Sequence, residues 1–161
     1  MNELEIIVAS LDEAGEILGS PSSCGGLGFV VSIGDPEDRP PSGYRNVREK
    51  IRLAFYDSHD HVGPNEDDID RLIEFARLIA TRPGRVLAHC AAGISRSTAA
   101  AYIIYAVAYG EGREEEALER VFAQRPIASP NRRMVAIADR RLGRRGKLIE
   151  ALKVRDTDGL A

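Results

Sequence analysis

The sequence predicts an α/β protein with a largely parallel central sheet of about four strands, flanked by helices, and with a helix-rich carboxyl-terminal half. Two observations lead to this fold class. In the first part of the chain, short apolar runs that suit buried strands alternate with helix-like stretches. From residue 98 onward the apolar residues follow helical spacing, and no further strand is expected. Strands alternating with helices favour parallel pairing in one sheet.

The first elements begin at the amino terminus. Leu4–Ala9 is an apolar run that predicts a buried strand. Ser10–Glu13 has the Ser-x-x-Glu form of a capping box, which predicts a short helix that ends near Leu18. The stretch 19–28 is rich in Ser, Gly and Pro and is expected to be a loop, and Phe29–Ile33 is expected to be the next buried strand.

An irregular excursion is expected over 38–49, because this stretch holds a Pro-Pro pair and Gly43. A third strand is predicted at Ile51–Tyr56. Asn65 precedes three acidic residues and predicts the start of a helix. The apolar stripe of that helix is expected to comprise Ile69, Leu72, Ile73, Ala76, Ile79 and Ala80.

A fourth strand, Arg85–His89, follows an Arg-Pro-Gly turn. Thr98–Tyr109 is almost wholly apolar or aromatic, so this helix should be packed on several sides. Amphipathic helices are predicted at Arg113–Gln124, from 129 to 142 and around Lys147–Leu152.

The loop between the fourth strand and the apolar helix has the features of an anion-binding cradle. Backbone N–H groups in such a turn, and at the start of the following helix, point into one concavity. Gly93 permits backbone angles that other residues avoid, and Ala91 and Ala92 add little bulk. Cys90 lies at the base of the loop and Arg96 at its end, where a guanidinium can hold two phosphoryl oxygens together. This setting favours the thiolate form of a cysteine, whereas a cysteine after a strand can also be an inert buried thiol.

The nine residues His89 to Ser97, which read His-Cys-Ala-Ala-Gly-Ile-Ser-Arg-Ser, closely resemble the signature of protein tyrosine phosphatases. The Ala-Ala-Gly-Ile-Ser-Arg-Ser part is similar to the dual-specificity branch of that superfamily. The resemblance covers about two-thirds of the chain, Phe29 to Asn131, and implies no cofactor; the length and the 43% hydrophobic content predict one domain over residues 1–161, which is then dual-specificity-phosphatase-like. It implies catalytic roles for Cys90, Arg96, Ser97 and His89, and phosphate binding by Ala91, Ala92, Gly93, Ile94, Ser95 and Arg96. Ser97 could instead only cap the helix, and His89 could serve only packing.

A proton donor is expected in the loop after the third strand, because the departing oxygen of a phosphomonoester leaves poorly as an anion. Asp57 is the first candidate, since it resembles in position the general-acid aspartate of dual-specificity phosphatases. The loop here is longer than in compact members of that family, so Asp60 stays open as an alternative. His59 and His61 beside these aspartates also permit a metal site, although phosphoryl transfer to cysteine needs no metal and none is predicted.

Composition narrows the classes of partner and compartment. The net charge of −3 and the pI near 5.7 argue against a nucleic-acid or anionic-membrane binder. A basic run near the carboxyl terminus is expected to be a solvated helix face, with attraction of an acidic substrate as the alternative; it comprises Arg132, Arg133, Arg140, Arg141, Arg144, Arg145 and Lys147. No signal-peptide or membrane-spanning run is present, and a functional thiolate suits a reducing compartment, so a cytoplasmic location is expected. Cys24 is expected to be an ordinary thiol, or else a redox partner of Cys90.

The function predicted from these residues is phosphomonoester hydrolysis through a phosphocysteine intermediate, by a protein tyrosine or dual-specificity phosphatase acting on a phosphorylated protein or a small phosphomonoester. A non-catalytic module that binds phosphate or sulfate ligands in the same cradle is the alternative from another class. A rhodanese-like sulfurtransferase is a third possibility. The oligomeric state cannot be predicted from the sequence.

Overall fold

The computed structural model of the protein describes residues 3–20, 26–82 and 84–160, the last four by their backbone alone. Its strands are β1 (Glu5–Ala9), β2 (Leu27–Gly34), β3 (Glu49–Ala54) and β4 (Arg85–His89). Its helices are α1 (Leu11–Gly19), α3 (Glu66–Thr81), α4 (Arg96–Tyr109), α5 (Glu114–Gln124), α6 (Arg132–Arg141) and α7 (Lys147–Leu160), with a short 3-10 helix, η1, at Tyr44–Asn46. Cys24 lies outside the described residues.

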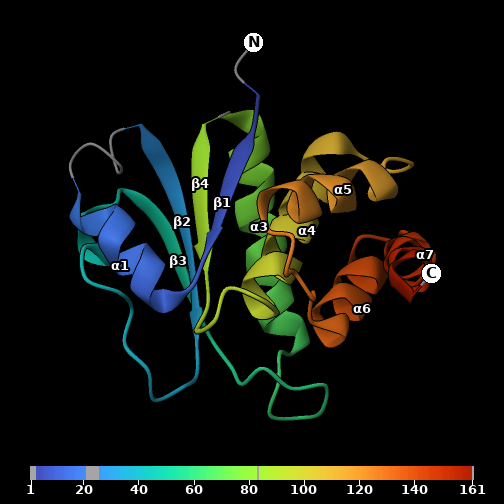
Figure 1. Ribbon diagram of the computed structural model, residues 1–161, viewed down its shortest axis with the longest axis horizontal. Helices are drawn as coiled ribbons and strands as arrows, with labels where there is room; N and C mark the ends of the chain where they lie inside the picture. The colour runs from blue at the N-terminus through green and yellow to red at the C-terminus, as the bar shows by residue number, and fades with distance from the viewer. Residues whose placement is uncertain (1–2, 21–25, 83, 161) are drawn as a thin grey trace.

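The four strands form one sheet in the order β1-β4-β2-β3, and every neighbouring pair is parallel. The predicted α/β class and the parallel sheet are therefore confirmed. All four strands end at the same edge of the sheet, which lies at the bottom of the view in Figure 1. The loops that leave this edge, at 35–43, 55–65 and 90–95, hang side by side below it.

Helices cover the two faces of the sheet unequally. Helix α1 packs on one face, where Ala14 and Leu18 contact Val30 and Leu87 of the central strands. Helices α3, α4, α5 and α6 lie on the other face, as Figure 1 shows, and α4 is at the centre of the larger apolar core. Eleven residues of α4, from Arg96 to Ala106, are buried, which explains why its sequence has no polar face.

Both predicted helix caps in the first half of the chain are confirmed. Ser10 and Glu13 form the reciprocal capping box of α1. Asn65 and Asp68 do the same for α3. Within α3, Ala80 is exposed, contrary to the expected stripe. Phe75 is buried instead, where its ring packs edge-on against Phe29 of β2.

The third strand begins and ends two residues earlier than the sequence predicts. Its pairing with β2 stops at Ala54 because β2 itself ends at Gly34, before the Asp35-Pro36 turn. Tyr56 then donates its N–H to the carbonyl of Val62, which closes the following loop on itself.

None of the helices within the described residues has the length and apolarity that a bilayer-spanning segment requires.

Candidate active site

The loop from Cys90 to Ser95 connects β4 to α4 at the edge where the parallel strands end. Each carbonyl of residues 90–95 accepts a hydrogen bond from a group outside the loop's concavity. The donors, in chain order of the carbonyls, are His89 Nδ1 (3.1 Å), Leu11 N (3.0 Å), Arg125 Nη2 (3.3 Å), Arg125 Nε (3.0 Å), Ser129 N (2.8 Å) and Asn131 N (3.1 Å). In a trans peptide the N–H lies opposite the preceding carbonyl. The N–H groups of residues 91–96 therefore turn inward and form an anion cradle.

Gly93 allows the loop to pass close to the start of α1. Its φ is +71°, in the left-handed region that favours glycine. A Cβ at this position would lie 2.7 Å from the backbone carbon of Ala9 and 2.7 Å from the backbone nitrogen of Ser10. Backbone atoms cannot move aside as a flexible side chain can, so only glycine fits here.

Cys90 lies at the base of the cradle and is buried. Its sulfur is 3.1 Å from the hydroxyl oxygen of Ser97, in the first turn of α4. A hydroxyl at this distance can donate a hydrogen bond to a thiolate. The structure thus places the Ser97 side chain on the sulfur, whereas the N-cap position of α4 belongs to Ser95.

Arg96 is 4% exposed, and its guanidinium is anchored on one side only. Nη1 donates to Asp35 Oδ1 at 2.8 Å and to the carbonyl of Phe55 at 2.6 Å. Nε is buried and has no hydrogen-bond partner among the described residues. A buried donor without a partner is costly, and it is satisfied when a ligand with an oxygen acceptor binds. The anchored guanidinium and its free Nε therefore suit an anion held in the loop.

Asp57 lies beside the cradle, although it is exposed. Its Oδ1 accepts hydrogen bonds from the hydroxyl of Ser95 at 2.6 Å and from Nδ2 of Asn131 at 2.8 Å. The second carboxylate oxygen takes part in neither bond. Asp57 is thus held against the loop by one residue of the loop and by the buried N-cap residue of α6.

Asp60, the other candidate acid, faces its own loop. Its Oδ1 accepts from the hydroxyl of Ser58 and from the N–H of Val62. These two hydrogen bonds, the Ser58 bond first, hold the pKa of Asp60 below its ordinary value. A lowered pKa leaves a smaller fraction of Asp60 protonated at neutral pH, and its hydrogen bonds stay within its own loop, whereas Asp57 contacts Ser95 of the cradle; the geometry therefore favours Asp57 for this role.

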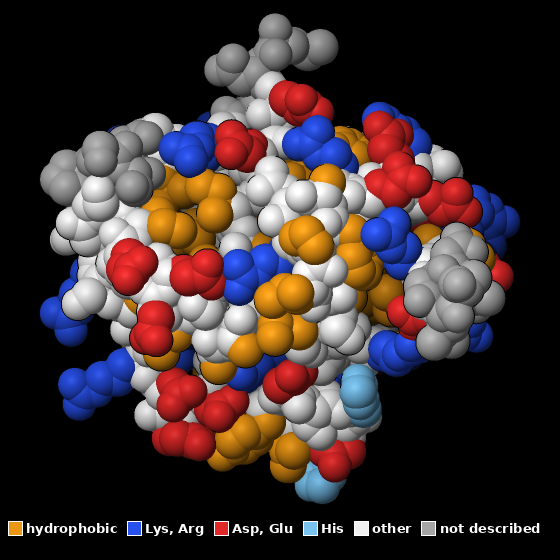
Figure 2. All heavy atoms as spheres, in the orientation of Figure 1, with side chains coloured by type: hydrophobic (Ala, Val, Ile, Leu, Met, Phe, Trp, Pro, Cys, Tyr) orange, Lys and Arg blue, Asp and Glu red, His pale blue; other side chains and the backbone are white. Residues whose placement is uncertain are grey.

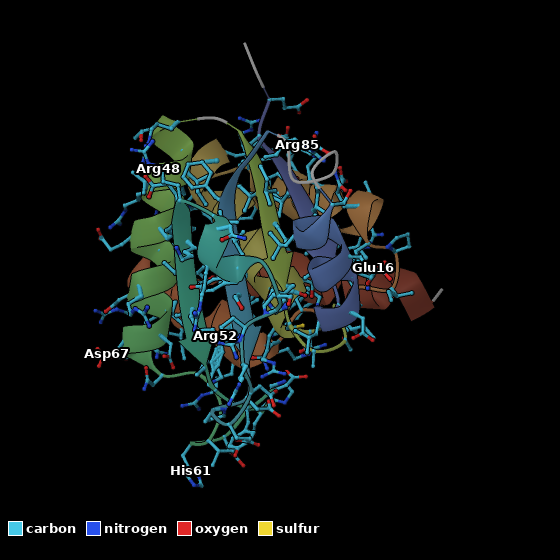
Figure 3. The ribbon with its side chains drawn as sticks, turned by 90° about the vertical axis from the view of Figure 1, so that its left-hand side faces the viewer. Glu16, Arg48, Arg52, His61, Asp67 and Arg85 are labelled. Atoms are coloured by element: carbon cyan, nitrogen blue, oxygen red, sulfur yellow. The ribbon has the colours of Figure 1, made fainter. Side chains whose placement is uncertain are left out.

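His59 and His61 of this loop are not grouped with enough potential metal ligands, among the described residues, to form a metal site. His61 is at the outer tip of the loop, far from the strands, in Figure 3. No group of three or more His, Cys, Asp or Glu side chains that could hold a metal ion occurs among the described residues.

His89 is buried and faces away from the cradle. Its Nδ1 is 3.1 Å from the carbonyl of Cys90, and its Nε2 is 2.7 Å from the hydroxyl of Ser32 on β2. Burial lowers the pKa of His89 from 6.5 to about 4, so the imidazole is neutral at physiological pH. A neutral imidazole carries one N–H, and the carbonyl at Nδ1 can only accept.

Several residues at this site were not predicted from the sequence. Asp35 anchors Arg96, Asn131 binds Asp57, and Arg125 bonds two carbonyls of the loop while it is paired with Glu13 of α1. The order Arg-Pro-x3-Pro-Asn, which resembles a segment of dual-specificity phosphatases, was the only signal for Arg125 and Asn131. Nothing in the sequence distinguishes Asp35 from an ordinary turn residue.

The basic run on α6 and after it is largely neutralised. Arg141 donates to both carboxylate oxygens of Asp70 at 2.8 Å, and Arg140 lies 3.4 Å from Glu66. The other ion pairs of the run are Arg132 with Asp156, Arg144 with Glu114, and Arg145 and Lys147 with Glu111. The acidic partners of this run favour a surface of structural ion pairs over attraction of an acidic substrate.

Acidic side chains gather at the lower end of the molecule in Figure 2, where the strands end.

Comparison of the sequence with protein-family models and with curated proteins gives no match. Solved structures do match. Human DUSP28 aligns with a TM-score of 0.63 over 93% of this chain and 94% of its own, at 18% identity. The Yvh1 phosphatase domain from Chaetomium thermophilum aligns with a TM-score of 0.61 over 86% of this chain and 90% of its own, at 25% identity. The human tyrosine phosphatase-like serine/threonine/tyrosine-interacting protein aligns with a TM-score of 0.58 over 76% and 84%, at 18% identity. The chain has the fold of the cysteine-dependent dual-specificity phosphatases.

Proposed function

We propose that this chain, which combines the dual-specificity phosphatase fold with a Cys-x5-Arg loop, hydrolyses phosphomonoesters through a phosphocysteine intermediate. The observation that carries the proposal is the state of Arg96, whose Nη1 is anchored while its buried Nε has no hydrogen-bond partner in the part of the chain that the structure describes. The inward N–H groups of residues 91–96 supply the remaining donors. A phosphoryl group has three oxygens that these donors can bind at once.

In the first step the Cys90 thiolate attacks phosphorus, and the bond from phosphorus to the leaving oxygen breaks. The backbone N–H groups of the cradle and Arg96 bind the three equatorial oxygens, where charge lies in the transition state. Asp57 gives its proton to the leaving oxygen, so that an alcohol or phenol departs rather than an alkoxide. The bonds from Ser95 and Asn131 hold the Asp57 side chain beside the cradle for this transfer.

In the second step water attacks the phosphocysteine, and Asp57, now ionised, takes the proton of that water. The phosphorus–sulfur bond breaks and inorganic phosphate forms. The hydroxyl of Ser97, 3.1 Å from the sulfur, donates to the departing thiolate and makes it a better leaving group. His89 bonds the carbonyl of Cys90 and so keeps the first peptide of the loop in its inward orientation.

The substrates that this site suits are phosphotyrosine and mixed phosphoprotein substrates, or small phosphomonoesters. No lysine lies between Cys90 and Arg96, so the cradle lacks the additional cation that often accompanies polyphosphorylated lipid substrates. Acidic residues near the cradle support the same preference. Glu37 and Asp38 are exposed in the turn that contains Asp35, the partner of Arg96. Substrates with a single phosphoryl group meet less repulsion there.

The test is hydrolysis of p-nitrophenyl phosphate by the wild type and by Cys90→Ser, together with calorimetric binding of tungstate to both. We expect turnover by the wild type, with trapping of a phosphocysteine on Cys90 after rapid acid quench. Cys90→Ser should lose turnover by about 10⁴-fold or more and still bind the oxyanion. Oxyanion binding by a wild type that shows no turnover would instead identify a non-catalytic phosphate-binding module. Turnover of thiosulfate without phosphatase activity would identify a sulfurtransferase.

A further inference from the structure

Three side chains form a row across neighbouring strands at the edge that bears the phosphate loop. His89 of β4 is the register partner of Ser32 of β2, and Ser32 is the register partner of Arg52 of β3. Register partners in parallel strands point to the same face of the sheet. Figure 3 shows Arg52 near the carboxyl ends of the strands, where the row ends on the edge strand.

The hydrogen bonds along this row can all run in one direction, from Arg52 toward His89. Arg52 Nη1 lies 2.8 Å from Ser32 Oγ, and a guanidinium can only donate. The Ser32 hydroxyl therefore accepts from Arg52 with one of its two lone pairs, which leaves its proton available to His89 Nε2, 2.7 Å away. The carbonyl of Cys90 beside Nδ1 can only accept, so the proton of the neutral ring lies on Nδ1, and the unprotonated Nε2 accepts from Ser32.

The tautomer of His89 bears directly on the nucleophile. Only Nδ1–H can donate to the carbonyl of Cys90, at 3.1 Å. This bond holds the peptide between Cys90 and Ala91, so that the N–H of Ala91 points into the cradle. With the proton on Nε2, two lone pairs would face each other at the Cys90 carbonyl and the peptide would lose its anchor.

The fold holds Arg52 in this position from several sides. Its Nη2 donates to the carbonyl of Asp38 at 3.0 Å, in the loop after β2. The guanidinium also passes over Gly34, where a Cβ would lie 2.5 Å from Nη2. The charged and titratable groups that act on Arg52 are Asp38, Tyr44 and Arg96, with His89 beyond Ser32. Arg52 is therefore a fixed donor at the end of the row and not a freely moving surface cation.

We propose that Arg52 is a positioning residue for the Cys90 loop: it acts through Ser32 to favour the Nδ1–H tautomer of His89 and so keeps the first N–H of the cradle turned inward. This inference rests on the proposed phosphatase function and identifies how that site is regulated by a residue two strands away. It concerns the resting protein, so it does not require that substrate be bound.

The experiment compares Arg52→Met, Arg52→Lys, Ser32→Ala and Gly34→Ala with the wild type. The tautomer of His89 is read from the ¹⁵N shifts of its imidazole, and ionisation of Cys90 from the pH dependence of alkylation of the Cys90 peptide. In Arg52→Met and Ser32→Ala we expect His89 to lose the Nδ1–H preference, the alkylation midpoint to rise by about one pH unit, and kcat to fall about tenfold with little change in KM. Arg52→Lys, which still donates, should recover part of each effect.

Gly34→Ala keeps the charge of Arg52 and displaces its guanidinium, so it should reproduce the change in tautomer. Arg85→Met is the matched control, because Arg85 lies at the opposite end of β4 and pairs only with Glu5 within the described residues. Unchanged His89 shifts and an unchanged Cys90 midpoint in Arg52→Met would overturn the inference. A rise in KM alone would also overturn it, by making Arg52 a substrate contact. The tautomer and alkylation measurements need no turnover, so an inactive wild type would refute the proposed function without deciding this one.

Discussion

A few single residues determine the shape of the phosphate cradle. Gly93 alone permits the contact between the loop and the start of α1, and Arg125 bonds the carbonyls of Ala92 and Gly93 from outside. Hydrogen bonds from Arg125 and Ser10 lower the pKa of Glu13, the partner of Arg125 on α1, to about 2. Glu13 therefore stays ionised, and its ion pair with Arg125 intact, through the pH range near 4.5 where a glutamate ordinarily titrates.

Gly93→Ala tests whether the cradle needs this close contact. Gly143 is the control, because its φ of +66° is nearly the same and a Cβ there would meet no atom within 4 Å. We expect Gly143→Ala to lose roughly 1–2 kcal/mol of unfolding free energy from backbone strain alone and to keep its kcat. Gly93→Ala should lose roughly 1–3 kcal/mol more, because of overpacking, and most of its activity. Equal losses in the two variants, measured in urea, would show that the contact has no effect.

At the scale of whole elements, the start of α6 joins the acid loop to the phosphate loop. Asn131 is the N-cap of α6, where its Oδ1 accepts from the N–H of Met134 at 2.9 Å. Its Nδ2 donates to Asp57, and its backbone N–H donates to the carbonyl of Ser95. The start of this helix thus fixes both the loop that holds Cys90, the proposed nucleophile, and Asp57, the proposed acid.

Asn131→Ser removes the contact with Asp57 and keeps a residue that can cap α6. Serine is a good N-cap, so helix stability should be retained, but its side chain is too short to reach Asp57. We expect kcat for phenyl phosphate to fall about tenfold while kcat for p-nitrophenyl phosphate changes little, because only a poor leaving group needs the acid. Asn65→Ser, at the cap of α3, is the matched control and should show the leaving-group dependence of the wild type. A uniform loss of kcat across leaving groups would contradict the role given to Asn131.

At the scale of the whole molecule, the fold buries one titratable side chain of the sheet, His89. His89 is 1% exposed, between β2 and the phosphate loop, and its folded-state pKa is about 4 against an ordinary 6.5. Between these two values the unfolded chain binds a proton that the folded chain does not. Unfolding is therefore favoured as the pH falls through this window.

The unfolding free energy should be independent of His89 above about pH 6.5 and should fall by about 3 kcal/mol, as an order of magnitude, between pH 6.5 and pH 4. Urea unfolding across this range measures it. His89→Gln should be less stable at neutral pH but should lack this slope, whereas His61→Gln, an exposed histidine, should keep it. Glu13→Gln should change the slope only below about pH 4.5, since the pKa of Glu13 is lowered from 4.5 to about 2. If the unfolding free energy of the wild type did not change between pH 6.5 and pH 4, this result would contradict a buried, neutral His89.

Much of the fold was predictable because its signals are local. The capping boxes at Ser10 and Asn65 and the strand Arg85–His89 depend on residues a few positions apart, and the structure has them as predicted. The end of β3 was predicted two residues late because it depends on where β2 ends. The exposure of Ala80 was missed because helical spacing alone does not show where the neighbouring layer stops.

The sequence by itself determined the α/β class, the loop from His89 to Ser97 and the roles proposed for Cys90 and Arg96, because the loop and these two residues lie in one continuous stretch with a specific spacing. Only the tertiary structure decided which groups surround that stretch. Asp35 reaches it from the turn after β2 and Asn131 from the N-cap of α6, while Arg52 acts on it only through Ser32, at distances set by the register of the sheet and the start of α6. The orientation of Asp57 toward the loop and of Asp60 away from it also depends on these contacts, since two aspartates three residues apart in one loop are chemically alike until packing and hydrogen bonds distinguish them.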